Sequence, residues 1–202
     1  MVRVKICGIT NLADARHAVE CGADALGFVF AKSPRRVRPD EAAKIVAAIG
    51  PWVAAVGVFV DEEPSTIERV ARRCGLTAVQ LHGDESPADV RRIRGVRVIK
   101  AFRVGDDFDF GEASRYPGAL LFDARVEGAY GGTGRTFDWR LLKKAPAGRP
   151  LILSGGLNPR NVREAVRLVK PYGVDASSSL ERSPGKKDPK LVKEFIRNAK
   201  KI

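Results

Sequence analysis

The sequence predicts an α/β fold, and within that class a single-domain (β/α)8 TIM barrel, from three observations. Short apolar runs recur along the whole chain, and each run after the first is preceded by a glycine. These glycines lie about 25 residues apart, which is the length of one strand, one helix and two short loops. The segments between the runs carry apolar residues at helical spacing. The glycines are Gly22, Gly50, Gly75, Gly95, Gly118, Gly148 and Gly173.

Eight strands are expected, because the runs are short, mostly continuous rather than alternating in polarity, and rich in Val, Leu and Ile. Parallel strands that are buried on both faces have this composition. The expected strands are residues 2–6, 25–30, 53–60, 78–81, 97–102, 120–122, 151–153 and 174–176.

Helices are expected between the strands. Apolar residues recur at helical spacing in 42–49 and again in 162–169. Helix starts are indicated by Asn11, which suits an N-cap, and by Pro39, Pro64 and Pro189, since proline is favoured in the first turn. The glycines are expected to close the helices in the left-handed conformation, which costs little without a Cβ.

Eight such units close into a barrel or form an open, doubly wound sheet. The barrel is favoured because no GxGxxG motif follows the first strand and because the units are of even length throughout. We therefore expect one barrel domain over residues 1–202.

The composition and charge narrow the classes of function that the protein could have. The 36 Lys and Arg residues exceed the 24 Asp and Glu residues, for a net charge of +12. This charge raises the alternative of a nucleic-acid-binding protein, but the basic residues are spread along the chain without interleaved aromatic residues for base stacking. No apolar run is long enough to span a membrane, and no signal peptide is visible. We expect a cytoplasmic protein with neither a nucleic-acid nor a membrane partner.

The three cysteines, Cys7, Cys21 and Cys74, form no CxxC pair, so neither a disulfide framework nor a zinc site is expected. In a barrel, functional residues gather where the strands end. Cys7 ends the first strand, and Lys5 points to the same face, where it would stabilise a thiolate that removes a proton from carbon. The alternative is that Cys7 is a small buried apolar residue.

Asp123 ends the sixth strand among apolar residues, surroundings that favour the acid form needed for proton donation. The alternative is a structural carboxylate that caps the next loop. Four further residues are expected to bind substrate at the same rim, Arg35 through its affinity for carboxylates. They are Arg35, Gln80, His82 and Asp175.

A phosphate site is expected at the loops after the seventh and eighth strands, where barrels often bind this group. Gly155 and Gly156 would offer closely spaced backbone N–H groups, and Ser177, Ser178 and Ser179 would offer hydroxyls. The alternative is a pair of tight turns. Gly132 and Gly134, in the loop after the sixth strand, complete the expected phosphate-binding set.

Nine blocks run in order from the first strand to the last helix: residues 4–10 (VKICGIT), 27–30 (GFVF) with 33–35 (SPR), 56–59 (VGVF), 79–83 (VQLHG), Asp123, 131–134 (GGTG), 153–159 (LSGGLNP), 174–175 (VD) with Ser177, Ser178 and Glu181, and 184–188 (PGKKD). In these blocks the chain resembles the phosphoribosylanthranilate isomerases of tryptophan biosynthesis.

The resemblance implies an Amadori rearrangement of N-(5-phosphoribosyl)anthranilate without cofactor or metal. It implies Cys7 as the general base, Asp123 as the general acid, and Arg35 at the anthranilate end. The chain departs from the family at Ser179, where glycine is usual, and a positive φ there would strain the phosphate loop.

Two alternatives to this activity are another sugar-phosphate isomerase of the histidine-pathway type and, from a different class, the nucleic-acid-binding protein. A histidine-pathway enzyme is expected to be longer and to carry a carboxylate where Cys7 stands. The partner implied by the resemblance is a small phosphorylated substrate. The sequence leaves open whether the enzyme is a monomer or a homodimer.

Overall fold

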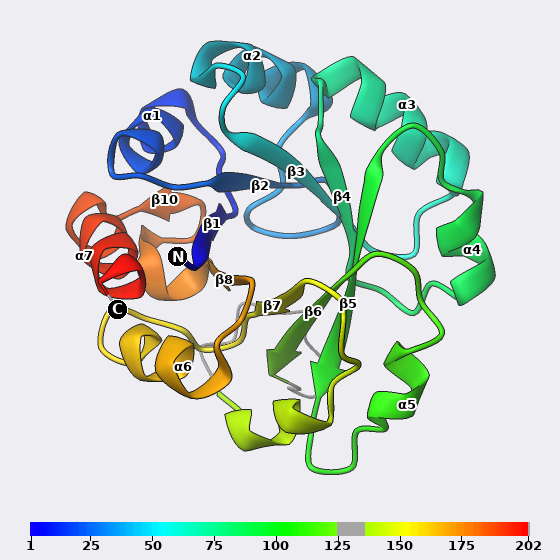
Figure 1. Ribbon diagram of the computed structural model, residues 1–202. Coiled ribbons are helices and arrows are strands. Elements are labelled where there is room, and N and C mark those ends of the chain that lie inside the picture. Colours follow the sequence, from blue (N-terminus) through cyan, green and yellow to red (C-terminus); the bar gives the residue numbers. More distant parts are fainter. Residues whose placement is uncertain (125–135, 202) are drawn as a thin grey trace.

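The computed structural model describes residues 1–124 and 136–201. Eight parallel strands close into a barrel in sequence order, with β8 paired to β1, and Figure 1 shows them at the centre of a ring of helices. The strands are β1 (Arg3–Cys7), β2 (Ala25–Val29), β3 (Ala54–Phe59), β4 (Ala78–Leu81), β5 (Arg97–Val104), β6 (Ala119–Ala124), β7 (Leu151–Leu153) and β8 (Gly173–Ala176). The predicted fold class is confirmed, with strand ends within two residues of expectation.

A helical segment follows each strand. The segments are α1 (Leu12–Glu20), α2 (Pro39–Ile49), α3 (Pro64–Cys74), α4 (Pro87–Arg92), α5 (Phe110–Ala113), η1 (Trp139–Lys144), α6 (Val162–Val169) and α7 (Pro189–Lys200). The sixth segment, η1, is a 3-10 helix, and α5 has four residues. In this part of the barrel the regular α-helix that the repeat predicts is therefore replaced by shorter elements.

The predicted helix starts are confirmed. The Asn11 side chain accepts a hydrogen bond from the backbone N–H of Asp14, and proline occupies the first turn of α2, α3 and α7. Six of the seven glycines have positive φ, but Gly173 does not, because it is the first residue of β8. Lys170 takes the left-handed position that closes α6, so the expectation for Gly173 is wrong.

Residues at alternate strand positions divide the core in two. The larger apolar cluster lies between the barrel wall and the helices. A smaller cluster fills the barrel interior, with Val56, Ile99, Leu121 and Ile152 among its members. Cys7, Asp123 and Asp175 lie on inward-facing positions nearer the carboxyl ends of their strands. The barrel thus directs these three side chains to one rim.

A hairpin follows β8 that the sequence did not predict. After the short 3-10 helix η2 (Ser178–Leu180), the antiparallel strands β9 (Glu181–Ser183) and β10 (Lys186–Lys187) pair with each other. The hydroxyl of Thr10 donates to the carbonyl of Gly185, 2.6 Å away, and so ties the hairpin to the loop after β1. The hairpin therefore lies beside the rim where β1 and β8 end.

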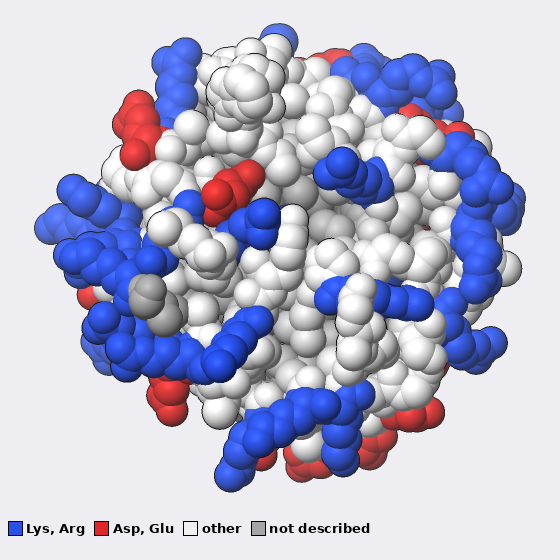
Figure 2. All heavy atoms as spheres, viewed as in Figure 1, with Lys and Arg blue, Asp and Glu red and all other residues white. Residues whose placement is uncertain are grey.

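The charged surface is mixed. Figure 2 shows Lys and Arg in many separate places around this face, with Asp and Glu among them. Exposed ion pairs also form on the surface, such as Arg38 with Glu41 and Arg73 with Asp40. Within the described ranges, no helix has the length and apolar character needed to cross a membrane.

Candidate active site

A pocket of about 660 Å³ opens at the carboxyl ends of the strands. The six residues predicted to act on substrate or bind it all line this pocket, together with Ser154 and Ser177. They are Cys7, Arg35, Gln80, His82, Asp123 and Asp175. The structure therefore brings together residues that are far apart in the sequence: four lie in β1, β4, β6 and β8, His82 directly follows β4, and Arg35 lies in the loop after β2.

Cys7 has its place in the pocket because its neighbour has no side chain. Cys7 ends β1 opposite Gly27 of β2, and it is 8% exposed. A Cβ at Gly27 would lie 2.7 Å from the Cys7 sulfur and 3.1 Å from Cε of Lys5. A side chain at position 27 would therefore displace the thiol of Cys7 and the side chain of Lys5. Gly27 therefore leaves room for the thiol and the lysine.

Lys5 forms a buried ion pair with Asp175, 3.0 Å from Nζ to Oδ1. Burial lowers the pKa of Lys5, but the charges of Asp175 and Cys7 outweigh it and hold that pKa above its usual value. Burial raises the pKa of the Cys7 thiol, and the positive charges of Lys5 and Lys187 counteract this only in part. The expected effect of Lys5 on Cys7 is present, but burial outweighs it in the free protein.

Asp123, the second-last residue of β6, has polar partners, where the sequence predicted apolar surroundings. Its Oδ1 accepts the backbone N–H of Ala124 at 2.8 Å, and its Oδ2 lies 3.4 Å from Nε2 of His82. The Gln80 amide lies 2.9 Å from Nδ1 of His82. When this amide donates, the proton of the neutral ring is on Nε2 and faces Asp123. Asp123 thus faces the pocket with a polar group near each of its carboxyl oxygens.

Arg35 is held in place by a carboxylate of the protein itself. Its Nε and Nη2 donate to both oxygens of Glu181, at 2.8 to 3.1 Å, in the bidentate arrangement typical of guanidinium and carboxylate. Glu181 also accepts from Lys187 at 2.8 Å. Burial raises the pKa of Glu181, but Arg35 and Lys187 outweigh it and bring the pKa below its usual value.

The two predicted phosphate loops lie side by side beyond β7 and β8. Gly155 and Gly156 both have positive φ. A Cβ at Gly155 would lie 2.3 Å from the backbone nitrogen of Ala124 and 2.8 Å from Oδ1 of Asp123. Gly155 is therefore required for close packing against the β6 end, in addition to any role in anion binding. Ser177 lines the pocket; Gly155, Gly156, Ser178 and Ser179 stand outside its lining.

The condition for strain at Ser179, a positive φ, is not met. Ser179 lies in η2 without a positive φ, and its hydroxyl donates to the carbonyl of Leu157. The serine that replaces the family's usual glycine therefore links the loop after β8 to the loop after β7. The other two predicted phosphate ligands, Gly132 and Gly134, lie outside the described residues.

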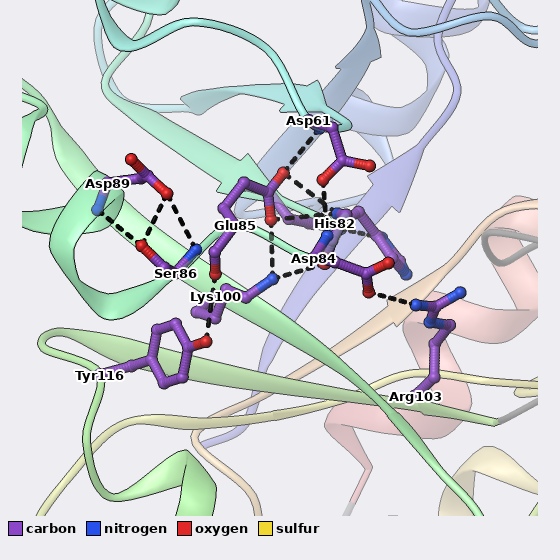
Figure 3. Close-up of polar contacts among 11 residues, drawn as sticks. Asp61, His82, Asp84, Glu85, Ser86, Asp89, Lys100, Arg103 and Tyr116 are labelled. Atoms are coloured by element: carbon purple, nitrogen blue, oxygen red, sulfur yellow. Dashed lines mark hydrogen bonds and ion pairs between the residues drawn. The ribbon is translucent and has the colours of Figure 1, made fainter.

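Sequence reasoning missed a buried hydrogen-bond network next to His82, centred on Glu85 and Lys100, which Figure 3 shows. Both oxygens of the Glu85 carboxylate accept the backbone N–H of Gly83 at 3.1 Å, and Oε1 also accepts that of Asp61 at 3.0 Å. Nζ of Lys100 donates to Glu85 and to the carbonyl of Gly83, both at 2.7 Å. The network fixes the loop that directly follows His82.

The local sequence held a signal for this network. Glu85 lies four residues after the end of β4 and two after Gly83, and Lys100 stands between Ile99 and Ala101 in the buried middle of β5. A Cβ at Gly83 would lie 2.2 Å from Oδ1 of Asp61. Gly83 therefore allows the loops after β3 and β4 to meet, and the buried lysine of β5 finds its carboxylate there.

Lys187 and Glu181 were likewise not assigned roles from the sequence, although both lie in the blocks that carry the resemblance. They belong to the β9–β10 hairpin, whose side chains return to the rim beside Cys7. The site is thus built from the barrel strands and from this hairpin.

A thiol, a carboxyl and an imidazole in one pocket at the catalytic end of a barrel define an enzyme that performs acid–base chemistry on a small molecule. The comparisons with known proteins give the family. Residues 4–198 match the family described as N-(5'phosphoribosyl)anthranilate (PRA) isomerase. The chain belongs to this family, whose members are isomerases of tryptophan biosynthesis.

Individual relatives agree. The N-(5'-phosphoribosyl)anthranilate isomerase of Geobacter sulfurreducens is 54% identical over 99% of each chain. The crystal structure of phosphoribosyl anthranilate isomerase from Thermotoga maritima has a TM-score of 0.91 at 48% identity, covering 100% of both chains. A crystal structure of such an isomerase in complex with reduced 1-(o-carboxyphenylamino)-1-deoxyribulose 5-phosphate has a TM-score of 0.88 at 46% identity, again over 100% of both chains.

Proposed function

We propose that the pocket converts N-(5'-phosphoribosyl)anthranilate into 1-(2-carboxyphenylamino)-1-deoxyribulose 5-phosphate with Asp123 as general acid and Cys7 as general base. The observation that carries this assignment is that the two side chains, from β6 and β1, line one pocket at the carboxyl end. General acid–base catalysis requires both groups within reach of one substrate.

In the first step Asp123 donates a proton to the ring oxygen of the ribose. The bond from C1′ to that oxygen breaks, and the lone pair of the anthranilate nitrogen forms the C1′ imine. The neighbouring Nε2 of His82 supports the carboxylate that remains, because it lies 3.4 Å from Oδ2.

In the second step the Cys7 thiolate removes the proton from C2′, and the electrons of that bond move toward the iminium nitrogen. The resulting enolamine tautomerises to the ketone, so the atoms of the product are those of the substrate. Because only a thiolate accepts this proton, the step depends on the charges that face Cys7.

The substrate's two anionic ends fix its direction in the pocket. The phosphate would lie at the loops that contain Gly155, Gly156 and Ser177, the usual phosphate position in barrels. The anthranilate carboxylate would lie toward Arg35, on the loop after β2. Nε and Nη2 of Arg35 donate to Glu181, so the substrate carboxylate would bind through the remaining nitrogen, Nη1. We also infer a cytoplasmic location, which suits a protein whose three cysteines are free thiols.

Turnover of N-(5'-phosphoribosyl)anthranilate by purified variants tests the two roles. Cys7→Ala and Asp123→Asn are each expected to lower kcat by about 10²- to 10⁴-fold, the range that acid–base catalysis contributes. Cys21→Ala is the matched control, since its thiol lies outside the pocket, and its kcat should equal that of the parent enzyme. Substantial turnover by both site variants would refute the assigned mechanism.

A further inference from the structure

Lys187 is a buried lysine that the proposed mechanism does not use. It lies in β10 with its side chain 2% exposed, and its ammonium group donates to Glu181 at 2.8 Å. It also donates to the carbonyl of Ser177 at 3.2 Å. Burying an ammonium group is costly unless it is paired, and the carboxylate of Glu181 is the partner that stabilises it here.

Ser177 connects Lys187 to the base. The Ser177 hydroxyl donates to the backbone carbonyl of Cys7 at 3.1 Å, and Ser177 lines the same pocket. Glu181, the partner of Lys187, in turn holds Arg35 in two-point contact. Lys187 is thus connected to the proposed base through Ser177 and to Arg35 through Glu181.

The charges around Cys7 do not balance while its side chain is a neutral thiol. Among the described residues that surround it, β1 supplies Lys5, the loop after β2 supplies Arg35, and β10 supplies Lys187. Against these three cations stand two carboxylates, Asp175 of β8 and Glu181 of β9. One positive charge is left over, and ionisation of Cys7 would neutralise it.

Asp123 of β6 lines the same pocket and is neutral while it carries the proton that the proposed mechanism assigns to it, and Lys32, Arg36 and Glu62 of the lining are exposed. Asp14 of α1 accepts the backbone N–H of Lys187 at 2.9 Å and is partly exposed. Solvent therefore screens it more than it screens the buried groups. The surplus charge of the buried cluster therefore acts on Cys7 more strongly than the charge of Asp14 does.

We propose that Lys187 is a positioning residue that acts through Cys7: its buried ammonium group supplies the surplus positive charge that favours the thiolate. The inference rests on the proposed role of Cys7 as base. The electrostatics agree in direction, because Lys187 lowers the pKa of Cys7 while burial, the larger influence, raises it. Burial lowers the pKa of Lys187 as well, and Glu181 counteracts this.

The test measures the Cys7 thiolate directly, without turnover. Iodoacetamide alkylates thiolates, and mass spectrometry of the Cys7 peptide gives the rate at this site alone, between pH 6 and 10. Lys187→Met should move the midpoint of the rate profile upward by roughly one pH unit, so that alkylation at neutral pH slows about tenfold. Lys187→Arg retains the charge and should restore the parent profile.

The hairpin offers a matched control. Lys186 precedes Lys187 in β10 but is exposed, so Lys186→Met should leave the midpoint unchanged. An equal shift in both methionine variants would mean that overall charge, and not the buried ammonium group, sets the profile, and would overturn the proposal.

The carboxylate partner gives a test of opposite sign. Glu181→Gln adds to the surplus charge and should move the midpoint downward, while the double variant Lys187→Met/Glu181→Gln keeps one surplus charge and should lie near the parent. Should Lys187→Met prove unfolded by circular dichroism, these two variants decide the matter. A folded Lys187→Met with the parent midpoint, or a Glu181→Gln shift upward, would overturn the proposal.

The same variants separate this inference from the proposed function. If the alkylation midpoints shift as expected but the pH profile of kcat/KM does not follow them, Cys7 is not the base, although Lys187 does act on its thiolate. If neither the alkylation midpoint nor the pH profile of kcat/KM shifts, the proposed role of Lys187 is refuted. The role of Cys7 as base is then still tested by the kcat of Cys7→Ala.

Discussion

The two ends of the barrel hold cavities of similar size and different chemistry. The amino-end cavity is about 740 Å³ and the carboxyl-end pocket about 660 Å³. Small and apolar residues such as Ala25, Ala54, Val56 and Ala78 line much of the amino-end cavity, with arginines at its margin. The carboxyl-end pocket is lined by a thiol, an imidazole and buried carboxyl groups.

The difference lies in the order of residues along each strand. Early interior positions in several strands carry alanine or valine, as at Ala54 and Val56, whereas late interior positions in β1 and β6 carry the reactive groups of Cys7 and Asp123. Apolar residues of the interior cluster separate the two ends. Cavity size therefore does not identify the site, whereas buried and paired titratable groups do.

The largest expected effect concerns stability at the carboxyl end. Lys100→Met removes the cation that pairs with Glu85, whose side chain is 5% exposed. An unpaired buried carboxylate costs about 3–5 kcal/mol, so the free energy of unfolding in urea should fall by that amount. The double variant Lys100→Met/Glu85→Gln should recover part of the loss.

The exposed pair of Arg38 and Glu41 provides the contrast, because 82% of the Arg38 side chain is exposed. Arg38→Ala should leave the unfolding midpoint unchanged. Equal midpoints for Lys100→Met and the parent would show that the buried network does not stabilise this end.

The next effect compares arginines at the two ends. Arg35→Ala should raise KM about 10- to 100-fold, since hydrogen bonds to a charged group contribute about 1.5–3 kcal/mol. Arg97→Ala changes the same residue type at the amino-end margin and should leave KM unchanged. If Arg97→Ala raised KM and Arg35→Ala did not, the substrate would bind at the amino end of the barrel, contrary to the proposal.

The pH dependence of kcat/KM tests the buried thiol. Burial raises the pKa of Cys7, and the base acts only when deprotonated, so activity is lost as pH falls below that pKa. We expect kcat/KM of the free enzyme to rise about tenfold per pH unit on the acid side. The midpoint should lie above the usual pKa of a thiol, which is about 8.5. A midpoint in the carboxyl range would point to a different base.

The smallest effect is expected at Ser179. Ser179→Gly removes the hydroxyl that donates to Leu157 and loosens the backbone, so stability should fall by about 0.5–1 kcal/mol and KM should rise a few-fold. Thermal unfolding and steady-state kinetics measure both. Ser179→Ala removes the hydroxyl alone; if it matched the parent while Ser179→Gly did not, backbone freedom would be the cause.

The fold could be predicted because each barrel unit repeats the same local signals. Strand composition and capping residues such as Asn11 act over a few neighbours, and the structure has them where expected. The segment η1 and the hairpin β9–β10 could not be predicted, because contacts with distant segments stabilise them. One example is the hydrogen bond from Thr10 to Gly185.

Only the site residues at or near strand ends could be predicted from the sequence; their contacts with distant segments could not. Cys7 and Asp123 follow apolar runs, so their meeting at one rim follows from the topology. The partner of Arg35 is Glu181, 146 residues away, and no local pattern specifies that pair. The surroundings of Asp123 were mispredicted for the same reason, since His82 follows β4 and lies far from Asp123 in the sequence.

The central claim is that chemistry occurs at the carboxyl end between Cys7 and Asp123. A crystal structure of this protein with the reduced product analogue tests it most directly. We predict the Cys7 sulfur about 3–3.5 Å from C2′, a near-attack distance, and the Asp123 carboxyl about 2.6–3.2 Å from the oxygen that closes the ribose ring. A ligand seated in the amino-end cavity, or one whose C2′ lies beyond the reach of Cys7, would contradict the account.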